Sequence, residues 1–373
     1  MALSLLLTAR GAVAQLDRAA ALTLEQQGRN AEAEQVWQQV AASTPANPEP
    51  WAHIGLLEAR QEHYERAVEA YQRALELAPK LPGLQLNLGL AYFKSNRFAE
   101  AIKPFAAELQ QHPGDLRLII LLGMSHYGLG DYLVAIPFLQ QAAAADPQSL
   151  PLRMALAHSC LWSKQYACVM DTYKQILALD PQSAEADMLA GEALDEEGDA
   201  NGAIEQFRAA THANPKEPNV HFGLGYLLWT QSNYNDAIPE FRAELANDPG
   251  HLQALAYLGD SLVQTSQYND ALPVLERAIA VDATFELPHR DLGIVYAQLG
   301  RKEQAIAELE RAIALDPNDV APHWRLARLY QAMGRKEEAK QQFGQASKMN
   351  QESLRAVRDQ MSRRTAEASQ AAH

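Results

Sequence analysis

Proline recurs at intervals of 34 residues through most of this chain of 373 residues. The series is Pro45, Pro79, Pro113, Pro147, Pro181, Pro215, Pro249 and Pro317, with Ala283 in the one vacant place. Because proline has no amide hydrogen and disfavours helix in the residue before it, each member of the series should end a helix. A strict period of this length predicts stacked repeats in place of the two or three globular domains that the length alone would indicate.

The same period orders the small and large side chains. The repeats are numbered here from residues 14, 48, 82, 116, 150, 184, 218, 252, 286 and 320. Position 8 is then always Gly or Ala, position 20 is Ala except for Val169, and position 24 is always aromatic or Leu. Small residues let two helix backbones approach closely, and large residues fill the space around that contact. We therefore expect each repeat to be a pair of closely packed helices.

This pattern resembles the tetratricopeptide repeat, which has an aromatic residue at position 4, Gly at 8, Ala at 20 and 27, an aromatic residue at 24 and Pro at 32. The second repeat matches it best, with Trp51, Ile54, Gly55, Ala67, Tyr71, Ala74 and Pro79. The resemblance implies an all-α fold, a right-handed α-solenoid (superhelix) of about ten 34-residue helix-turn-helix repeats over residues 14–353. Gly130, Gly198 and Gly300 are expected in the turn between the paired helices, where a left-handed backbone favours glycine.

Two segments flank the repeats. In residues 1–14 an apolar run, Leu3–Leu7, precedes the small residues Ala12–Ala14, an order that resembles a secretory signal peptide cleaved before Gln15. The alternative is a frayed N-terminal helix, and we favour an exported, periplasmic protein over a cytoplasmic one. In residues 354–373, apolar residues at helical spacing predict a C-terminal helix that caps repeat ten, followed by a basic or disordered tail.

The charge of the chain is uneven. The formal net charge is −14, but Val320–His373 contains ten Lys and Arg against five Asp and Glu. An acidic chain lacks the concentrated basic face that nucleic acid requires, so we expect no nucleic-acid partner. A basic end on an acidic body would allow copies to self-associate, although a solvated final helix is the simpler interpretation. No apolar run is long enough for a transmembrane segment.

The sequence lacks the phosphate-binding loop, the dinucleotide fingerprint, the zinc-protease motif and the nucleophile elbow. Because the repeats run to about residue 350, they leave no room in this chain for a catalytic domain. We therefore predict no enzyme, no cofactor and no metal. His221, His289 and His323 all occupy position 4, one in each of three repeats, which separates them too widely for a shared zinc ion. We interpret them as packing residues between repeats.

Cys160 and Cys168 are the two cysteines, at positions 11 and 19 of repeat five. Position 19 is mostly polar in the other repeats, so we expect one half-buried thiol and one surface thiol. A disulfide would require Cα atoms within about 7 Å of each other, and the sequence leaves that distance open.

In tetratricopeptide repeat proteins the first helix of each repeat lines a concave surface, and this resemblance places positions 2, 5, 9, 12 and 13 in a groove. Repeats three, four, five and seven have apolar and aromatic residues there, where a solvent-facing surface would be polar. Repeat six interrupts them with carboxylates. Some residues at positions 5 and 9 could instead pack between helices. The predicted groove comprises Leu90, Phe93, Met124, Tyr127, His158, Leu161, Trp162, Glu192, Asp195, Glu196, Tyr226 and Trp229.

These features predict a non-catalytic scaffold or adaptor, of bacterial type, that binds a peptide or protein partner in its concave groove. The carboxylates between two aromatic regions would prefer a basic residue flanked by apolar ones. Two alternatives stay open. One is a cell-envelope assembly or carbohydrate-associated factor, and the other is the repeat segment of a larger enzyme such as a transferase.

Overall fold

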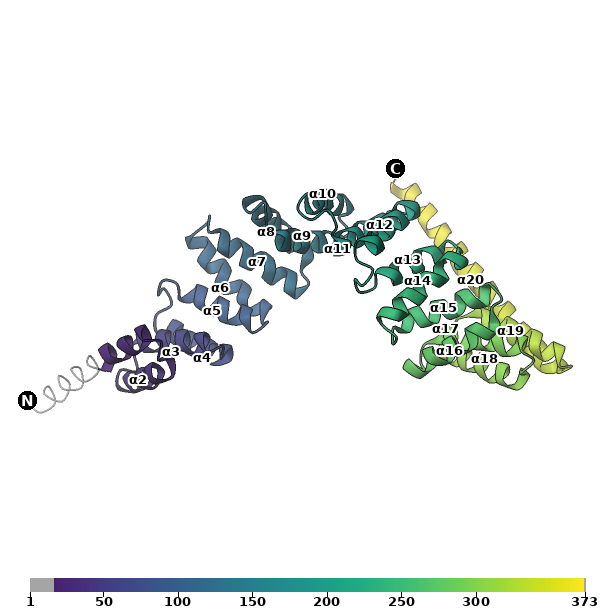
Figure 1. Cartoon of the computed structure of the whole chain (residues 1–373), viewed down its shortest axis with the longest axis horizontal. Helices are drawn as coiled ribbons and strands as arrows, with labels where there is room; N and C mark the ends of the chain where they lie inside the picture. Colours follow the sequence, from purple (N-terminus) through teal and green to yellow (C-terminus); the bar gives the residue numbers. More distant parts are fainter. Residues whose placement is uncertain (1–16, 372–373) are drawn as a thin grey trace, which may run out of the picture. The chain divides into compact units, whose positions relative to one another are not determined.

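The computed structural model describes residues 17–371, a range that contains helices and turns and no strand. It divides into two compact bodies, Met1–Pro181 and Gln182–His373, called here the N-terminal body and the C-terminal body (Figure 1). The division falls near the end of repeat five, after Pro181 and before the last two residues of that repeat. The signal peptide predicted at residues 1–14 lies outside the described residues.

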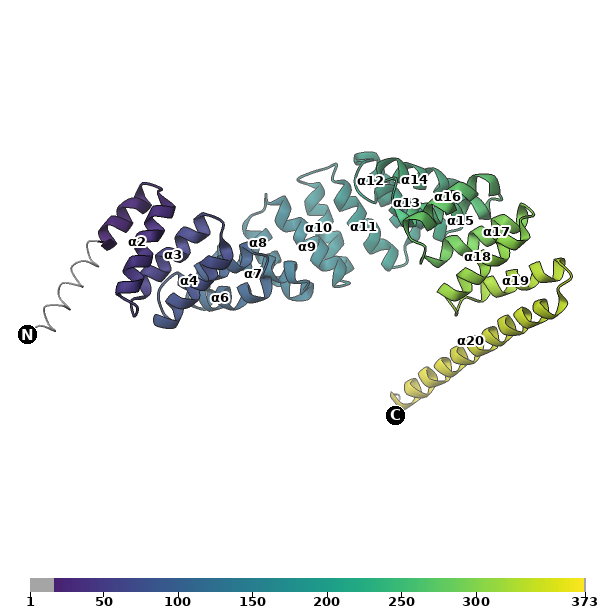
Figure 2. The ribbon, with the colours of Figure 1, turned by 90° about the horizontal axis from the view of Figure 1, so that it is seen from below.

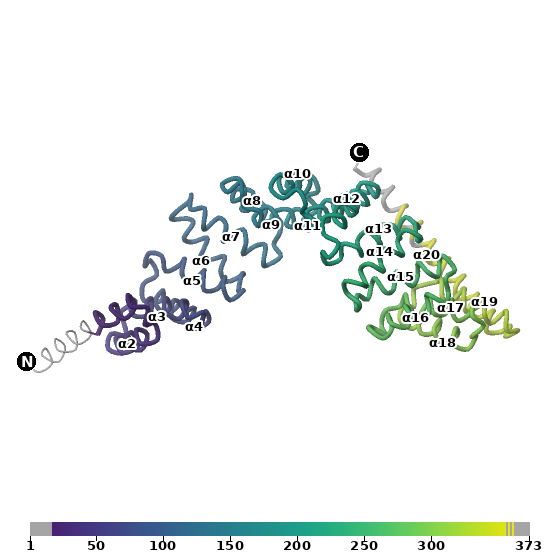
Figure 3. The backbone as a smooth tube through the Cα atoms, viewed as in Figure 1, coloured from purple at the N-terminus to yellow at the C-terminus, as the bar shows by residue number. Residues whose placement is uncertain are grey.

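Each repeat forms an antiparallel pair of helices. After a helical stretch at residues 17–26, the N-terminal body contains α2 (Asn30–Ser43), α3 (Pro48–Arg60), α4 (Tyr64–Leu77), α5 (Leu84–Lys94), α6 (Phe98–Gln111), α7 (Leu116–Leu129), α8 (Tyr132–Ala145), α9 (Leu150–Trp162) and α10 (Tyr166–Leu177). The C-terminal body contains α11 (Ala184–Glu196), α12 (Ala200–Ala213), α13 (Val220–Thr230), α14 (Tyr234–Asn247), α15 (Leu252–Gln264), α16 (Tyr268–Val281), α17 (Glu286–Gln298), α18 (Lys302–Leu315), α19 (Val320–Ala332) and α20 (Lys336–Ala371). Within each body the successive pairs stack side by side (Figure 3). The predicted all-α solenoid of helical repeats is confirmed.

The small residue at position 8 faces the large residue at position 24 of the same repeat. A Cβ atom on Gly259 of α15 would lie 2.2 Å from Cδ2 of Leu275 on α16, and one on Gly225 would lie 2.8 Å from Cε1 of Phe241. Leu275 and Phe241 are completely buried. The two helices of a repeat pack as closely as the sequence predicts, and this close packing requires glycine at these two positions.

The turn inside each repeat has a residue with a left-handed backbone at position 15. The predicted Gly130, Gly198 and Gly300 have φ values of 85°, 86° and 77°. The same conformation occurs in every repeat, whether or not the residue is glycine, with φ between 56° and 86°: Gly28, Glu62, Asn96, Gly130, Lys164, Gly198, Ser232, Ser266, Gly300 and Gly334. Stacking imposes this geometry even where the side chain disfavours it.

The position-4 histidines, interpreted from the sequence as packing residues between repeats, have hydrogen-bonding partners within their own repeats, and His289 also contacts the preceding repeat. Nδ1 of His289 lies 2.6 Å from Oε2 of Glu308, and Nδ1 of His221 lies 2.7 Å from Oε2 of Glu240. His323 makes the equivalent contact with Oε1 of Gln342 at 2.7 Å. Each of these partners is at position 23 of the same repeat, so the three histidines join the two helices of one hairpin. Nε2 of His289 also lies 3.1 Å from the carbonyl oxygen of Ala283 in the preceding repeat. A polar side chain at position 4 therefore has a hydrogen-bonding partner within its own repeat, which a buried polar group requires.

The expectation of two separate thiols is also wrong. Cys160 on α9 and Cys168 on α10 form a disulfide, with Cα atoms 5.8 Å apart. Cys160 is completely buried and Cys168 is half-buried. The polar character of position 19 in other repeats did not indicate that it faces position 11 of the paired helix. The disulfide covalently links the two helices of repeat five.

The C-terminal helix differs from the cap that the sequence suggested. Helix α20 is unbroken over 36 residues and combines the second helix of repeat ten with the segment that follows it. Leu354, Val357 and Met361 are 66%, 48% and 65% exposed. They therefore extend past repeat ten without covering it, as the far end of α20 in Figure 2 illustrates.

Candidate functional site

A cavity of about 460 Å³ opens on the first helices of repeats six, seven and eight. Two of its lining residues are the carboxylates Glu192 and Asp195 of α11, and both are exposed. Phe222 and Tyr226 of α13 form an aromatic wall. The remaining lining residues are Met188, Phe207, Asn219, Gly223, Leu227, His251 and Gln253. We call this space the C-terminal cavity.

The start of α13, which carries the aromatic wall, is held by a buried carboxylate. Glu244 of α14 is 2% exposed and accepts hydrogen bonds from the backbone N–H groups of Asn219 at 3.3 Å and Phe222 at 3.1 Å. A negative charge at the N-terminus of a helix satisfies its free donors and complements its dipole. Glu244 occupies position 27, where the repeat pattern expects Ala. This departure from the pattern orients Phe222.

Gly223 of α13 shapes the floor of the cavity. A Cβ atom on Gly223 would lie 2.2 Å from Cε1 of Phe207, so the Phe207 ring fills the space that any other side chain would take. Gly223 is at position 6, outside the positions that the repeat consensus assigns to glycine. Its presence lets the α12 ring reach the base of the cavity between α11 and α13.

His251 closes the side of the cavity next to α15. Its Nδ1 accepts a hydrogen bond from the backbone N–H of Ala254 at 3.1 Å, which caps α15. The hydrogen of the neutral ring is therefore on Nε2, which donates to Oδ1 of Asn219 at 2.9 Å. The His251 ring also lies 4.8 Å from the Phe222 ring, so the histidine both caps a helix and supports the aromatic wall.

The aromatic wall extends from the cavity toward repeat eight. Tyr226 stacks on Trp229 with ring centres 5.9 Å apart, and Trp229 meets Tyr257 edge to face at 4.8 Å. Burial raises the pKa of Tyr257, and the neighbouring Tyr226 and Asp260 add to the rise. Tyr257 therefore stays neutral at physiological pH. The surface beside the cavity is an uncharged group of rings, suited to apolar and aromatic ligand groups.

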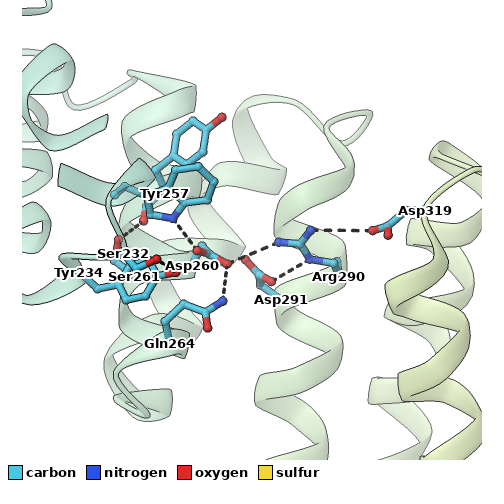
Figure 4. A network of polar contacts seen from close by, with 10 residues as sticks. Ser232, Tyr234, Tyr257, Asp260, Ser261, Gln264, Arg290, Asp291 and Asp319 are labelled. Carbon is cyan, nitrogen blue, oxygen red and sulfur yellow. Dashed lines mark hydrogen bonds and ion pairs between the residues drawn. The ribbon is translucent and has the colours of Figure 1, made fainter. Parts of the chain in front are cut away.

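A polar network continues along the same side of the C-terminal body (Figure 4). Trp229 donates through Nε1 to Oδ2 of Asp260 at 2.6 Å, and Gln264 donates to Oδ1 at 3.2 Å. Arg290 contacts Asp260 at 3.4 Å, Asp291 at 3.2 Å and Asp319 at 3.8 Å. Asp260 and Asp291 are 1% and 0% exposed. The network connects the first helices of repeats seven, eight and nine to the start of α19.

The N-terminal body has an aromatic surface of its own, which we call the N-terminal strip. Phe93 meets Phe98 edge to face at 5.4 Å, and the Phe98 ring occupies the place of a side chain at Gly128. Beside Gly128, the Tyr127 ring lies 6.2 Å from that of Trp162. Trp162, which is 51% exposed, also contacts Tyr132 at 4.5 Å and His158 at 5.1 Å. The rings form two groups over repeats three to five, one of Phe93 and Phe98 and the other of Tyr127, Tyr132, His158 and Trp162.

Models of the tetratricopeptide repeat match most of the chain. One matches residues 18–82, 54–116, 86–150, 171–218 and 193–251, more than half of the sequence. Others match residues 126–191, 295–334 and 321–353. The chain belongs to the tetratricopeptide repeat family. No curated protein matches it.

Several solved structures are similar to this tetratricopeptide repeat chain. MamA from Desulfovibrio magneticus is 22% identical over 45% of this chain and 96% of that one, with a TM-score of 0.43. YrrB, described as a TPR protein with an unusual peptide-binding site, is 17% identical over 51% of this chain and 97% of that one, with a TM-score of 0.43. The Cut9–Hcn1 hetero-tetramer of APC/C is 17% identical over 82% of this chain and 60% of that one, with a TM-score of 0.46. These likenesses concern the fold alone.

The structure separates the predicted groove residues of this tetratricopeptide repeat chain into two groups. Glu192, Asp195 and Tyr226 line the C-terminal cavity, with Trp229 beside it. Glu196 is exposed on the same helix but does not line the cavity. The N-terminal strip includes the predicted Phe93, Tyr127, His158 and Trp162.

Not every predicted position faces solvent. Leu161, at position 12 of α9, is 7% exposed and therefore belongs to the interior. Leu90 and Met124 are half-buried at position 9, where packing between helices was the stated alternative. Sequence reasoning did not single out Met188 or Arg290, although both occupy position 5, which the same rule assigns to the groove. His251 lies in a loop, outside that rule.

Within residues 17–371, no helix is both long and apolar enough to cross a membrane. In the same range, no three His, Cys, Asp or Glu side chains are grouped closely enough to hold a metal ion.

Proposed function

We propose that this tetratricopeptide repeat chain is a non-catalytic scaffold that binds a peptide segment of a partner protein. The C-terminal cavity accepts a Lys or Arg side chain of that segment together with an apolar neighbour. The observation that carries the proposal is the composition of the cavity, in which Glu192 and Asp195 share one space with the Phe222 and Tyr226 rings. A cation gains from carboxylates and from ring faces, and the stem of Lys or Arg packs on apolar surface.

The proposal is tested by selecting peptides from a random displayed library on the full chain. Peptides that combine Lys or Arg with an aliphatic or aromatic residue should be enriched. An enriched peptide is then titrated by calorimetry into the Glu192→Gln and Asp195→Asn variants. Loss of a charge-assisted contact of about 1.5–3 kcal/mol corresponds to roughly 10- to 100-fold weaker binding.

Glu196→Gln is the matched control, because Glu196 is an acidic residue of the same helix outside the cavity. It removes one negative charge without changing the lining, so its affinity should stay within about two-fold of the original. Equal weakening by all three variants would mean that general acidity attracts the peptide. Enrichment of acidic peptides, or affinities unaffected by Glu192→Gln and Asp195→Asn, would refute the assignment of the cavity.

The N-terminal strip is proposed as a second contact surface for an apolar part of a partner. Its support is the 51% exposure of Trp162 among three other rings. Exposed aromatic residues of this kind are frequent at interface hot spots. A partner identified with the C-terminal cavity should protect Trp162 from solvent, which oxidative footprinting of the original chain, read by mass spectrometry, measures.

Export remains a proposal, and the disulfide between Cys160 and Cys168 supports it. Disulfides persist in oxidising compartments and are rare in the reducing cytosol. Protein isolated from its native host with thiols blocked at lysis should carry no label on either cysteine, and the mass of its N-terminus should correspond to a chain that begins at Gln15. An intact Met1 with two labelled thiols would place the protein in the cytosol.

A further inference from the structure

The last part of α20 presents an apolar face to solvent. Earlier in this helix, Ala339 and Ala346 are 4% and 0% exposed, and Phe343 packs on Trp324 of α19 with ring centres 5.4 Å apart. Leu354, Val357 and Met361 continue the same side of the helix at spacings of three and four residues. Their exposure of 66%, 48% and 65% is unusual for consecutive apolar residues on one face. We call these three residues the α20 stripe.

The surroundings of the α20 stripe are basic. Arg355 and Arg358 are exposed next to it, and Val320–His373 has twice as many basic as acidic residues. The remainder of the chain is strongly acidic, since the whole carries a net charge of −14. A helix with apolar residues and flanking arginines matches the composition of the C-terminal cavity, where Met188 and two aromatic rings lie beside two carboxylates. Peptide helices commonly bind in grooves by such a face.

The helix cannot reach the cavity of its own chain without breaking. Helix α20 is continuous from Lys336, and its first part is packed on α19. At 1.5 Å per residue, the α20 stripe begins about 27 Å along the axis from the start of the helix. Figure 2 shows the far end of α20 lying apart from α13, which carries the cavity wall. The cavity that the stripe can enter is therefore on another molecule.

We propose that the α20 stripe of one copy docks in the C-terminal cavity of a second copy of this chain. The inference rests on the proposed function, because it assigns an occupant to the same cavity. The α20 stripe and the C-terminal cavity are different surfaces, so each copy can donate its stripe to one neighbour and accept the stripe of another. A contact of this heterologous kind repeats from copy to copy and produces open chains or rings in place of a closed dimer. Self-association is concentration-dependent and is weakened by salt, which screens the charged part of the contact.

Two variants of the full chain test the inference by sedimentation equilibrium. The tail variant, Leu354→Asp with Met361→Asp, removes the stripe, and the body variant, Glu192→Lys with Asp195→Lys, reverses the charge of the cavity. All four positions are exposed, so circular dichroism should show unchanged helicity. The original chain should show an average mass that rises past that of a dimer with concentration. Each variant alone should stay monomeric.

An equal mixture of the two variants is the decisive measurement. The tail variant has an intact cavity and the body variant an intact stripe, so the mixture should form a one-to-one pair and stop there. If α20 helices instead paired with each other, the body variant alone would dimerise, and the inference would be overturned. A chain that stays monomeric at every concentration would overturn it as well.

Peptide selection on the tail variant keeps this inference separate from the proposed function. If the stripe competes with peptides, the tail variant should bind an enriched peptide several-fold more tightly than the original chain at high protein concentration. Tight peptide binding together with a monomeric original chain would refute only the docking of α20. Failure of peptide binding would count against the cavity itself.

Discussion

Replacing Asp291 by Asn should change the pH dependence of stability in a defined direction. Asp291 is completely buried, and its Oδ1 accepts a hydrogen bond from Nε of Arg290 at 3.2 Å. Among the described residues its Oδ2 has no hydrogen-bond partner. Burial raises the pKa of Asp291 well above its ordinary value of 3.8; Arg290 opposes this rise, and the nearby Asp260 carboxylate adds to it. Removal of Asp291 from water therefore outweighs its attraction to the Arg290 guanidinium.

The sign of the effect follows from proton linkage. Below pH 3.8 Asp291 is protonated in both the folded and the unfolded chain. As the pH rises, the unfolded chain releases this proton while the folded chain keeps it, so the free energy of unfolding falls by about 1.4 kcal/mol per pH unit from this group. The fall ends where Asp291 ionises in the folded chain. Asn does not titrate, so the stability of Asp291→Asn relative to the original should increase with that slope above pH 4 and then level off.

Urea unfolding followed by circular dichroism between pH 4 and 8 measures the difference, and hydrogen exchange of the α17 amides assigns it to that helix. Asp270→Asn, at an exposed carboxylate of α16, is the control and should change stability little at any pH. A difference that stays constant with pH would mean that Asp291 does not retain a proton on folding. An original chain that gains stability over Asp291→Asn as the pH rises would show an ionised Asp291 paired with Arg290, and the reasoning from burial would be wrong.

Three further experiments test the packing. Ser266→Gly should stabilise the chain by about 1 kcal/mol in urea unfolding, because Ser266 has a left-handed φ of 61°, and Gly300→Ser at the same repeat position should destabilise it. Reducing the disulfide between Cys160 and Cys168 should lower the free energy of unfolding by about 2.5 kcal/mol, because the unfolded chain regains loop-closure entropy. Faster proteolysis of repeat five measures this loss, and an unchanged rate would mean that the disulfide does not constrain the chain. Trp37→Ala, at a completely buried residue, should cost about 3–5 kcal/mol, whereas Trp162→Ala should cost less than half as much in the same assay; equal costs would place Trp162 in the core.

The repeat pattern predicted the packing inside each hairpin because the same contact recurs in every repeat. The pairing of a small residue with a large one, such as Gly225 with Phe241, recurs at positions 8 and 24 of all ten repeats. The residue types at these two positions are therefore enough to infer it. The turn residues were predicted only where they were glycine. Lys164 and Ser266 adopt the same conformation without the residue type that signals it. The contacts that recur in every repeat impose the left-handed backbone at position 15, even where the residue there is not glycine.

Contacts that occur once had no such signal. The disulfide depends on Cys160 and Cys168 facing each other across one hairpin, and the generally polar character of position 19 pointed to solvent instead. The link between Asp260 and Arg290 joins residues 30 apart, in neighbouring repeats, and Asp does not recur at the position of Asp260 in any other repeat. Glu244 could have been recognised from the sequence, because a carboxylate at a position that is most often Ala requires a specific partner for its burial.

The difference between a buried, hydrogen-bonded carboxylate and an exposed one indicates where a ligand's positive charge would bind in the C-terminal body. Two acidic residues, Glu192 and Asp260, occupy position 9 of the first helices there, and both would attract a cation if accessible. Asp260 is 1% exposed and already accepts hydrogen bonds from Trp229 and Gln264 besides its contact with Arg290. A ligand could reach it only by breaking these bonds within the protein. Glu192 is exposed at the edge of the cavity with Asp195 one turn further along α11. On the proposed function, a cationic side chain would therefore bind at repeat six, and the apolar part of the ligand would extend over the rings of repeat seven.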